Sequence, residues 1–115
     1  MTKVFKIPAE GIRQVAPGRG GCIASDRITV DGKRVGFMYR EQSEDDVDSG
    51  WRIMAGDESQ EYMDDPSHLA VYDLNTIANY DAEIISLLDA PVGAAFERSD
   101  DGSFVAVDFQ PPDVP

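Results

Sequence analysis

The sequence predicts a single α+β domain with a mainly antiparallel sheet of five or six strands and one main helix packed on one face. Residues 35–66 begin with alternating large apolar residues, pass into an acidic run and restart at Trp51, the only tryptophan. This is typical of two half-buried strands joined by a solvated connector. Asp-Gly pairs at 31–32 and 101–102 are hairpin signals, and hairpins join antiparallel neighbours. One helical apolar pattern stands out, at residues 82–88, without the strand and helix alternation of a parallel sheet.

Length and composition fit one soluble domain. A chain of 115 residues can hide roughly two thirds of its unfolded surface. Its formal net charge is −12, and the charge is uneven: residues 1–40 hold eight Lys or Arg against three acids, whereas residues 41–115 hold two against nineteen. Such acidity disfavours nucleic acid and anionic membranes as partners and favours basic ones. Acidity that only maintains solubility is an equally good explanation.

The termini and the single cysteine bear on location. The N-terminal residues lack the apolar run of a signal peptide, one cysteine cannot form an internal disulfide, and no apolar run reaches the length of a membrane span. We therefore expect a cytoplasmic protein. We expect residues 1–19 to form an N-terminal extension, residues 20–109 the folded domain and residues 110–115 a Pro-rich tail that is extended or disordered.

The first third of the chain predicts a short edge strand at residues 3–7, a loop at 16–21 and a hairpin. The loop holds three glycines, but Cys22 and Ile23 follow where a phosphate-binding loop needs Lys and then Ser or Thr. Residues 22–25 and 27–30 are predicted as strands. The Asp31-Gly32 turn then leads into a strand at 35–40 that pairs back antiparallel.

The middle of the chain predicts a turn, a strand and a short helix. Asp48, Ser49 and Gly50 suit a turn, because Asp and Ser bond nearby backbone groups and Gly reaches positive φ. A strand follows at 51–55, with Trp51 as a buried anchor. Residues 58–65 suit one or two helical turns with Asp57 or Ser59 as N-cap, and residues 69–74 are apolar enough for a central strand.

The C-terminal third predicts the main helix and a last hairpin. Asn75-Thr76 suit a short turn, and Asp81 can cap a helix at residues 82–88 that Pro91 and Gly93 end. Strands at 94–98 and 104–109 are expected on either side of the Asp101-Gly102 turn.

Residues with reactive side chains give no strong catalytic or metal signal. From Asp46 onward, the acidic run places Gly50 and Trp51 where a calcium loop needs a ligand and a glycine. A pair of the only cysteine, Cys22, and the only histidine, His68, is a weak nucleophilic candidate. Zinc needs three or four ligands that the chain lacks. We predict no catalytic residue, no metal and no cofactor.

The chain contains an ordered series of distinctive residues, which we interpret as structural: Arg40, Glu41, Asp48, Ser49, Gly50, Trp51, Gly56 and Tyr62. With this series, about residues 20–107 resemble the immunity protein 33 family. The resemblance implies an α+β fold, no catalytic residues, and a role in neutralising the toxin domains of bacterial polymorphic toxin systems.

The functional hypothesis is therefore an immunity protein that binds and neutralises a toxin protein through an acidic surface. The alternatives are a housekeeping module that binds a small ligand or regulates another protein, and, more weakly, an enzyme using Cys22 or His68. If the acidic side chains of residues 44–61 are only a solvated surface, we expect the partner-binding site on the sheet face around Arg40, Arg52 and Tyr62. The oligomeric state is left open. The acidic candidates for partner binding are Glu44, Asp45, Asp46, Asp57, Glu58 and Glu61.

Overall fold

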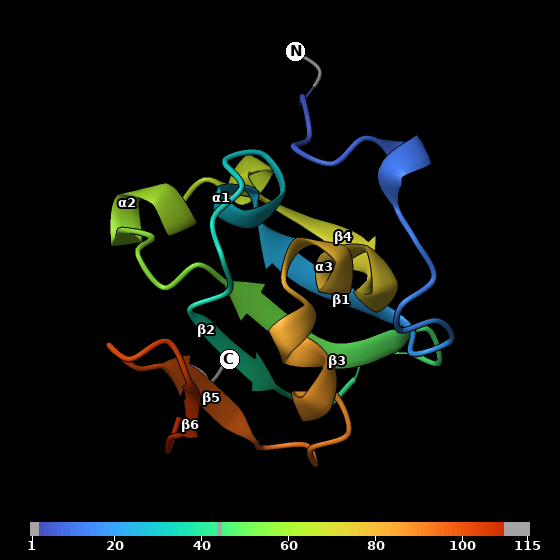
Figure 1. Ribbon diagram of the computed structural model, residues 1–115. Helices are drawn as coiled ribbons and strands as arrows, with labels where there is room; N and C mark the ends of the chain where they lie inside the picture. Colours follow the sequence, from blue (N-terminus) through green and yellow to red (C-terminus); the bar gives the residue numbers. More distant parts are fainter. Residues whose placement is uncertain (1–2, 44, 110–115) are drawn as a thin grey trace.

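The computed structural model describes residues 3–43 and 45–109, and Figure 1 shows their arrangement. Within these residues six strands form one sheet. The strands are β1 (Gly21–Ser25), β2 (Phe37–Arg40), β3 (Asp48–Met54), β4 (Leu69–Asp73), β5 (Ala95–Arg98) and β6 (Phe104–Ala106). The helices are α1 (Asp26–Thr29), α2 (Gln60–Met63) and α3 (Leu74–Tyr80), with 3-10 helices η1 (Ala9–Gly11), η2 (Pro66–His68) and η3 (Ala82–Leu87).

The sheet is mixed, with the order β4-β1-β3-β2-β5-β6. Four of its neighbouring pairs are antiparallel, and β1 with β3 is parallel. The predicted α+β class and the mainly antiparallel sheet of six strands are confirmed. The parallel pair was not predicted, because it joins strands that are distant in the sequence.

The hairpin predicted at Asp31-Gly32 is wrong, because residues 26–29 form helix α1 in place of a strand. The Ser25 hydroxyl accepts a hydrogen bond from the Arg27 N–H and starts the helix. Gly32, with φ of 78°, then ends the short helical segment. The chain leaves this segment without pairing and enters β2 only at Phe37.

The turn predicted at residues 48–50 is also wrong, because these residues are the first part of β3. Gly50 has φ of 89° and lies where the β1–β3 register shifts. This positive φ, which glycine adopts easily, therefore accompanies a β-bulge. A Cβ at Gly50 would lie 2.2 Å from the Glu41 carbonyl oxygen. The turn occurs earlier, where the Asp45 carboxylate accepts hydrogen bonds from the Val47 and Asp48 N–H groups.

Three further predictions differ from the structure. The longest α-helix is α3, within residues predicted as strand and turn, whereas the predicted main helix is the 3-10 helix η3, capped by Asp81 as expected. The strand β4 lies at the edge of the sheet and not at its centre. Residues 3–7 form no strand and pass over α1, where the Lys6 N–H donates to the Thr29 carbonyl.

Other predicted elements are confirmed. Residues 16–20 form a loop, Ser59 caps α2, and the turn through Gly102 joins β5 to β6. The predicted 104–109 strand ends at Ala106. The predicted Pro-rich tail, residues 110–115, lies outside the described residues.

The core lies between one face of the sheet and the helices α1, α3 and η3. Figure 1 shows α3 and η3 in front of β1 and β3, with α1 at the end of β1. Trp51 is fully buried there, as predicted, and its indole N–H donates to the Leu88 carbonyl at 3.2 Å. The Asn75 side chain of α3 accepts hydrogen bonds from the N–H groups of Val15 and Ala16, which fixes the N-terminal segment on the same side. No helix in the described part of the chain is long and apolar enough to cross a membrane.

Candidate functional site

The two faces of the sheet differ in what covers them. The helices α3 and η3 pack on the face that carries Cys22, Met38 and Trp51, which we call the covered face. Side chains alternate along strands, so the neighbouring residues project to the other side. We call that side the open face; its apolar residues, all partly or largely exposed, are Ile23, Phe37, Tyr39, Met54, Leu69 and Val71.

A small apolar depression lies in the middle of the open face, and we call it the central slot. Its volume is about 150 Å³. Met54 of β3 and Met63 of α2 line it from different elements, together with Ile23, Tyr39 and Leu69. Glu41 and Arg52 also line it, and Arg52 lies between Ile23 and Tyr39 in the sheet register. Methionine side chains adapt their shape easily, so the slot can adjust to an inserted group.

An acidic hollow of about 800 Å³ adjoins the slot at the start of β3. Its carboxylates come from three segments of the chain, whereas among the described residues that line it only Arg19 and Arg52 supply positive charge. The Arg52 guanidinium is buried and bonds both Asp48 oxygens at 2.9 Å, and it also pairs with Glu41. These bonds raise the pKa of Arg52 further above its usual value. The carboxylates that line this hollow are Glu41, Asp45, Asp46, Asp48 and Asp73.

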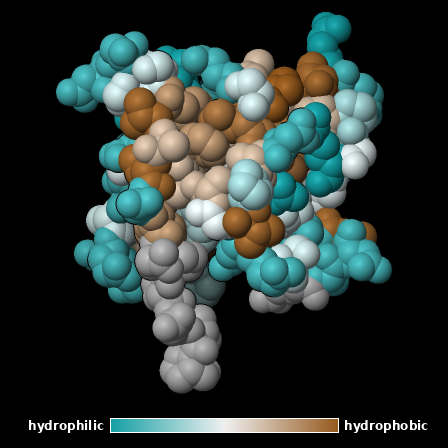
Figure 2. All heavy atoms as spheres, turned by 90° about the horizontal axis from the view of Figure 1, so that it is seen from below, coloured by the Kyte–Doolittle hydropathy of each residue, from teal (hydrophilic) through white to brown (hydrophobic). Residues whose placement is uncertain are grey.

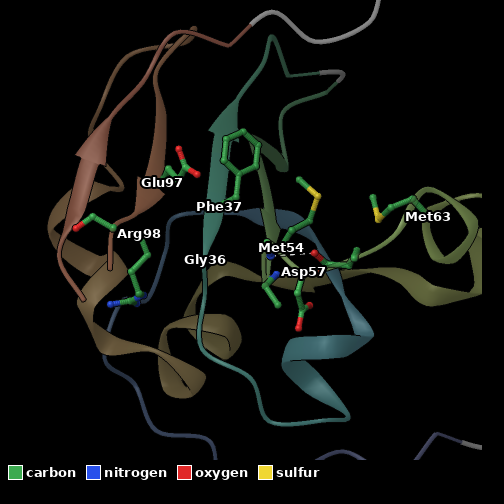
Figure 3. A pocket seen from close by; sticks show the side chains of 11 residues that line it. Gly36, Phe37, Met54, Asp57, Met63, Glu97 and Arg98 are labelled. Carbon is green, nitrogen blue, oxygen red and sulfur yellow. Dashed lines mark hydrogen bonds between the residues drawn. The ribbon is translucent and has the colours of Figure 1, made fainter. Parts of the chain in front are cut away.

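A third hollow, of about 550 Å³, lies beyond the other end of β3. Figure 3 shows Phe37 and Met54 side by side on β2 and β3, with Met63 across from them on α2. Glu97 and Asp57 stand on opposite sides of these apolar groups. The slot shares Met54 and Met63 with this hollow, and Ile23, Glu41 and Arg52 with the acidic hollow. The three depressions therefore form one continuous surface, apolar in the middle and acidic at both ends.

The structure divides the predicted acidic candidates between these two ends and does not gather them in one patch. Asp45 and Asp46 line the acidic hollow, whereas Asp57 and Glu58 line the hollow at the end of β3. Glu61, on α2, is exposed. Glu44 lies outside the described residues.

Three of these acids have local structural bonds. The Asp45 carboxylate holds the turn before β3, and Glu58 accepts hydrogen bonds from the Ala55 and Gly56 N–H groups at the end of the strand. Both oxygens of Asp57 bond Arg27, which lowers the pKa of that carboxyl. Substituting these acids would disturb the fold as well as the charge.

Three of the residues that match the family, Arg40, Ser49 and Trp51, make contacts where the sheet meets the end of η3. The Arg40 guanidinium donates to the Ser49 and Ala90 carbonyls at 2.9 and 2.7 Å, and Trp51 bonds the Leu88 carbonyl. Arg40 therefore serves the covered face, whereas Arg52 lies on the open face, so the alternative surface that would combine them does not exist. Tyr62 stacks on His68 with ring centroids 3.9 Å apart.

The sequence-based search missed the apolar residues of the open face. The alternation of Phe37 and Tyr39 was visible as strand pattern, but which face lacks a helix depends on tertiary packing. Phe109 adds to this surface, with its ring centroid 5.0 Å from Phe37 and 4.7 Å from Tyr39. Figure 2 shows the molecule from below, the side on which Figure 1 places β5 and β6. Apolar side chains also gather on this side, and hydrophilic side chains border them.

The reactive candidates lie apart from this surface. Cys22 is fully buried on the covered face, and burial raises the pKa of its thiol to about 12. The thiolate is therefore scarce at neutral pH, which removes the nucleophile of the proposed Cys-His pair. The His68 ring bonds the Tyr62 carbonyl at 2.7 Å. Among the residues that the structure describes, no three His, Cys, Asp or Glu side chains are arranged to hold a metal ion.

Comparison with known proteins identifies the family. Residues 22–108 match the family model of the Immunity protein Imm33 domain. This match covers all six strands of the sheet apart from Gly21, the first residue of β1. Searches of curated proteins and of solved structures give no match. Because the match covers most of the 115 residues, this chain belongs to the Imm33 immunity protein domain family.

Proposed function

We propose that this protein is an immunity protein that binds a basic bacterial toxin domain in the cytoplasm and neutralises it through the acidic ends of the open face. Membership of the Imm33 family supports the general role. The observation that favours this surface is the acidic hollow, where five carboxylates face two arginines beside an apolar slot. An acidic rim accelerates capture of a basic partner through long-range attraction.

A small-ligand module is less well supported. Pockets for drug-sized ligands enclose about 300 to 1,000 Å³ and are mainly apolar. The most apolar depression on the open face holds about 150 Å³, and the two larger ones are open and lined with charged groups. These shapes suit contact with a protein surface better than enclosure of a small molecule.

Protection of living cells tests the role directly. Where a gene next to this one encodes a toxin domain, that domain is expressed under an inducible promoter in a reporter bacterium, with and without this protein. We expect growth arrest without it and normal growth with it, and we expect the two purified proteins to form a stoichiometric complex. Continued arrest together with the absence of a complex would contradict the proposed function.

Association kinetics test the use of the acidic surface. Asp46 lines the acidic hollow and Glu97 lines the hollow at the end of β3. Both are exposed and outside the local bonds that hold Asp45, Asp57 and Glu58, so their reversal to Lys disturbs the fold least. We expect Asp46→Lys with Glu97→Lys to slow association with the toxin domain roughly tenfold at low salt, and less at physiological salt. Dissociation should change little, because rim charges act on the encounter.

A matched control separates local charge from net charge. Glu10 in η1 and Asp100 in the β5–β6 turn are exposed, and neither lines the open-face hollows. Reversing both to Lys changes net charge by the same amount as the test variant. Equal association rates for the two double variants would show that the rim acids have no special role.

A further inference from the structure

The central slot lies where an interface anchor would be expected. It is apolar, lies between two acidic hollows, and is formed by side chains from β1, β2, β3 and α2 with Leu69 of β4. Interface hot spots have this arrangement, in which a central apolar pocket excludes water and charged groups surround it.

The charge around the slot determines what kind of molecule can cover it. The hollow at the start of β3 carries five carboxylates, and the one beyond its end carries Asp57, Glu58 and Glu97 beside Arg98. A second copy of this chain would bring −12 against −12, and nucleic acid or anionic lipid would also be repelled. A basic protein surface has the complementary charge.

The geometry of β3 sets the spacing of the partner's groups. The two acidic hollows lie at opposite ends of this strand, which has seven residues from Asp48 to Met54. At about 3.3 Å per residue the strand spans about 20 Å. A partner that covers the whole surface therefore needs cationic side chains on both sides of its central contact, about 20 Å apart.

Resting on the proposed function, we propose that the toxin domain inserts one apolar side chain into the central slot, between Met54 and Met63, and places Lys or Arg side chains over the acidic hollows on either side. The inserted side chain holds the complex together, and the charged pairs speed its formation. Met63 comes from α2, so the slot closes around the inserted group from the sheet and from the helix.

The rates of dissociation test this assignment. Met63→Ala and Met54→Ala each remove one wall of the slot, and we expect each to raise the dissociation rate about ten- to thirtyfold, as for hot-spot residues, with association nearly unchanged. Val92→Ala is the control, because Val92 is 53% exposed and does not line the slot. Circular dichroism and thermal melting establish that each variant is folded.

A measurement on the unaltered protein avoids reliance on folding of the variants. With ¹³C-methyl methionine, the NMR signals of Met54 and Met63 should shift on addition of the toxin domain from the protection experiment. The signal of Met38, which is fully buried on the covered face, should stay in place.

The outcomes separate the two proposals. If the unaltered protein binds no toxin domain, the proposed function fails, and this inference fails with it. If it binds but the Met54 and Met63 signals stay in place and the slot variants dissociate at the parent rate, only the inserted side chain is overturned. Faster dissociation of both slot variants, with shifted Met54 and Met63 signals and an unaffected Val92→Ala, would support it.

Discussion

The covered and open faces of the same sheet have opposite chemistry. On the covered face, polar groups have internal partners: the indole of Trp51 bonds the Leu88 carbonyl, and Asp81 bonds Arg98 at the start of η3. On the open face, Phe37, Met54 and Leu69 remain partly exposed. The buried apolar side chains of the core lie on the covered face, whereas apolar side chains of the open face remain accessible to a partner. Substitutions on the two faces should therefore separate loss of folding from loss of binding.

The largest expected effect is at the centre of the covered face. Trp51→Ala should lower the free energy of unfolding by about 3 to 5 kcal/mol, because it leaves a large cavity and removes the bond to the Leu88 carbonyl. This is a large part of the stability of a small domain. The midpoint of denaturant unfolding measures it, and an unchanged midpoint would show that the covered face does not dominate stability.

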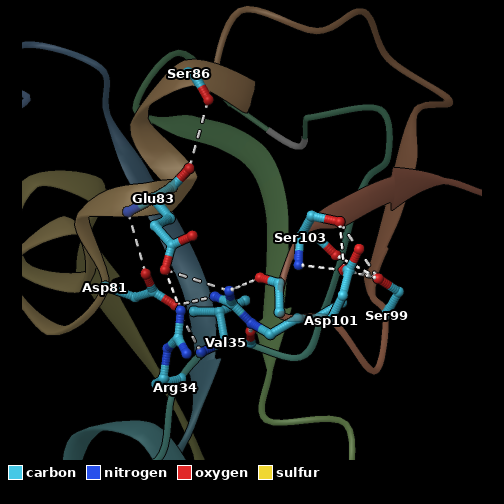
Figure 4. Close-up of polar contacts among 10 residues, drawn as sticks. Arg34, Val35, Asp81, Glu83, Ser86, Ser99, Asp101 and Ser103 are labelled. Carbon is cyan, nitrogen blue, oxygen red and sulfur yellow. Dashed lines mark hydrogen bonds and ion pairs between the residues drawn. The ribbon is translucent and has the colours of Figure 1, made fainter.

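The next effect tests the buried ion pair that joins η3 to β5. The Asp81 carboxylate accepts hydrogen bonds from the Val35 and Glu83 N–H groups, as Figure 4 shows. It also pairs with Arg98. Asp81→Ala would leave the Arg98 charge largely buried without this partner, and should cost about 3 kcal/mol. Glu83→Ala is a matched control, because the exposed Glu83 pairs with the same arginine at 3.4 Å. It should cost less than about 1 kcal/mol in the same unfolding measurement.

Substituting one methionine on each face compares the two faces directly, with the same residue type removed from both. Met38 is fully buried on the covered face, whereas Met54 is partly exposed on the open face. Met38→Ala should lower the free energy of unfolding by about 2 to 5 kcal/mol. Met54→Ala should lower it by about 1 kcal/mol, because the partly exposed Met54 side chain buries less apolar surface. Similar losses in chemical denaturation would show that the open face is as important for folding as the covered one.

The sequence predicted elements that depend on local pattern and missed those that depend on neighbours in space. Trp51 as an anchor and Asp81 as a cap follow from residue type and position. The helix α3 also left a signal, because Leu74, Ile77 and Ala78 are spaced for one buried helical face. That signal was obscured by the apolar run of β4 directly before it. The parallel β1–β3 pair has no local sequence signal.

The candidate site was predictable only in part. The acidic character of the region around β3 was visible in the sequence, and the structure places four of the candidate acids in open-face hollows. Sequence alone could not tell that Asp45 and Glu58 bond the backbone while Asp46 bonds no backbone group of the described residues, because such bonds depend on the turn that each residue occupies. The central slot was missed because its walls come from separate segments, with Met63 reaching Met54 only after α2 folds back.

The smallest expected effect lies in the β5–β6 turn, outside both faces. The Asp101 carboxylate accepts hydrogen bonds from the Ser103 and Ser99 hydroxyls and from the Ser103 N–H, and these lower its pKa from 3.8 to about 2. A depressed folded-state pKa stabilises the fold above the ordinary value, and this contribution is lost as pH falls from about 4 toward 2. The group is exposed, so the unfolding midpoint should change only slightly. Carboxyl ¹³C NMR should therefore show Asp101 titrating near pH 2, and Ser103→Ala should move that titration toward 3.8. Titration of Asp101 at the ordinary value in the parent protein would show that the turn does not hold the carboxylate.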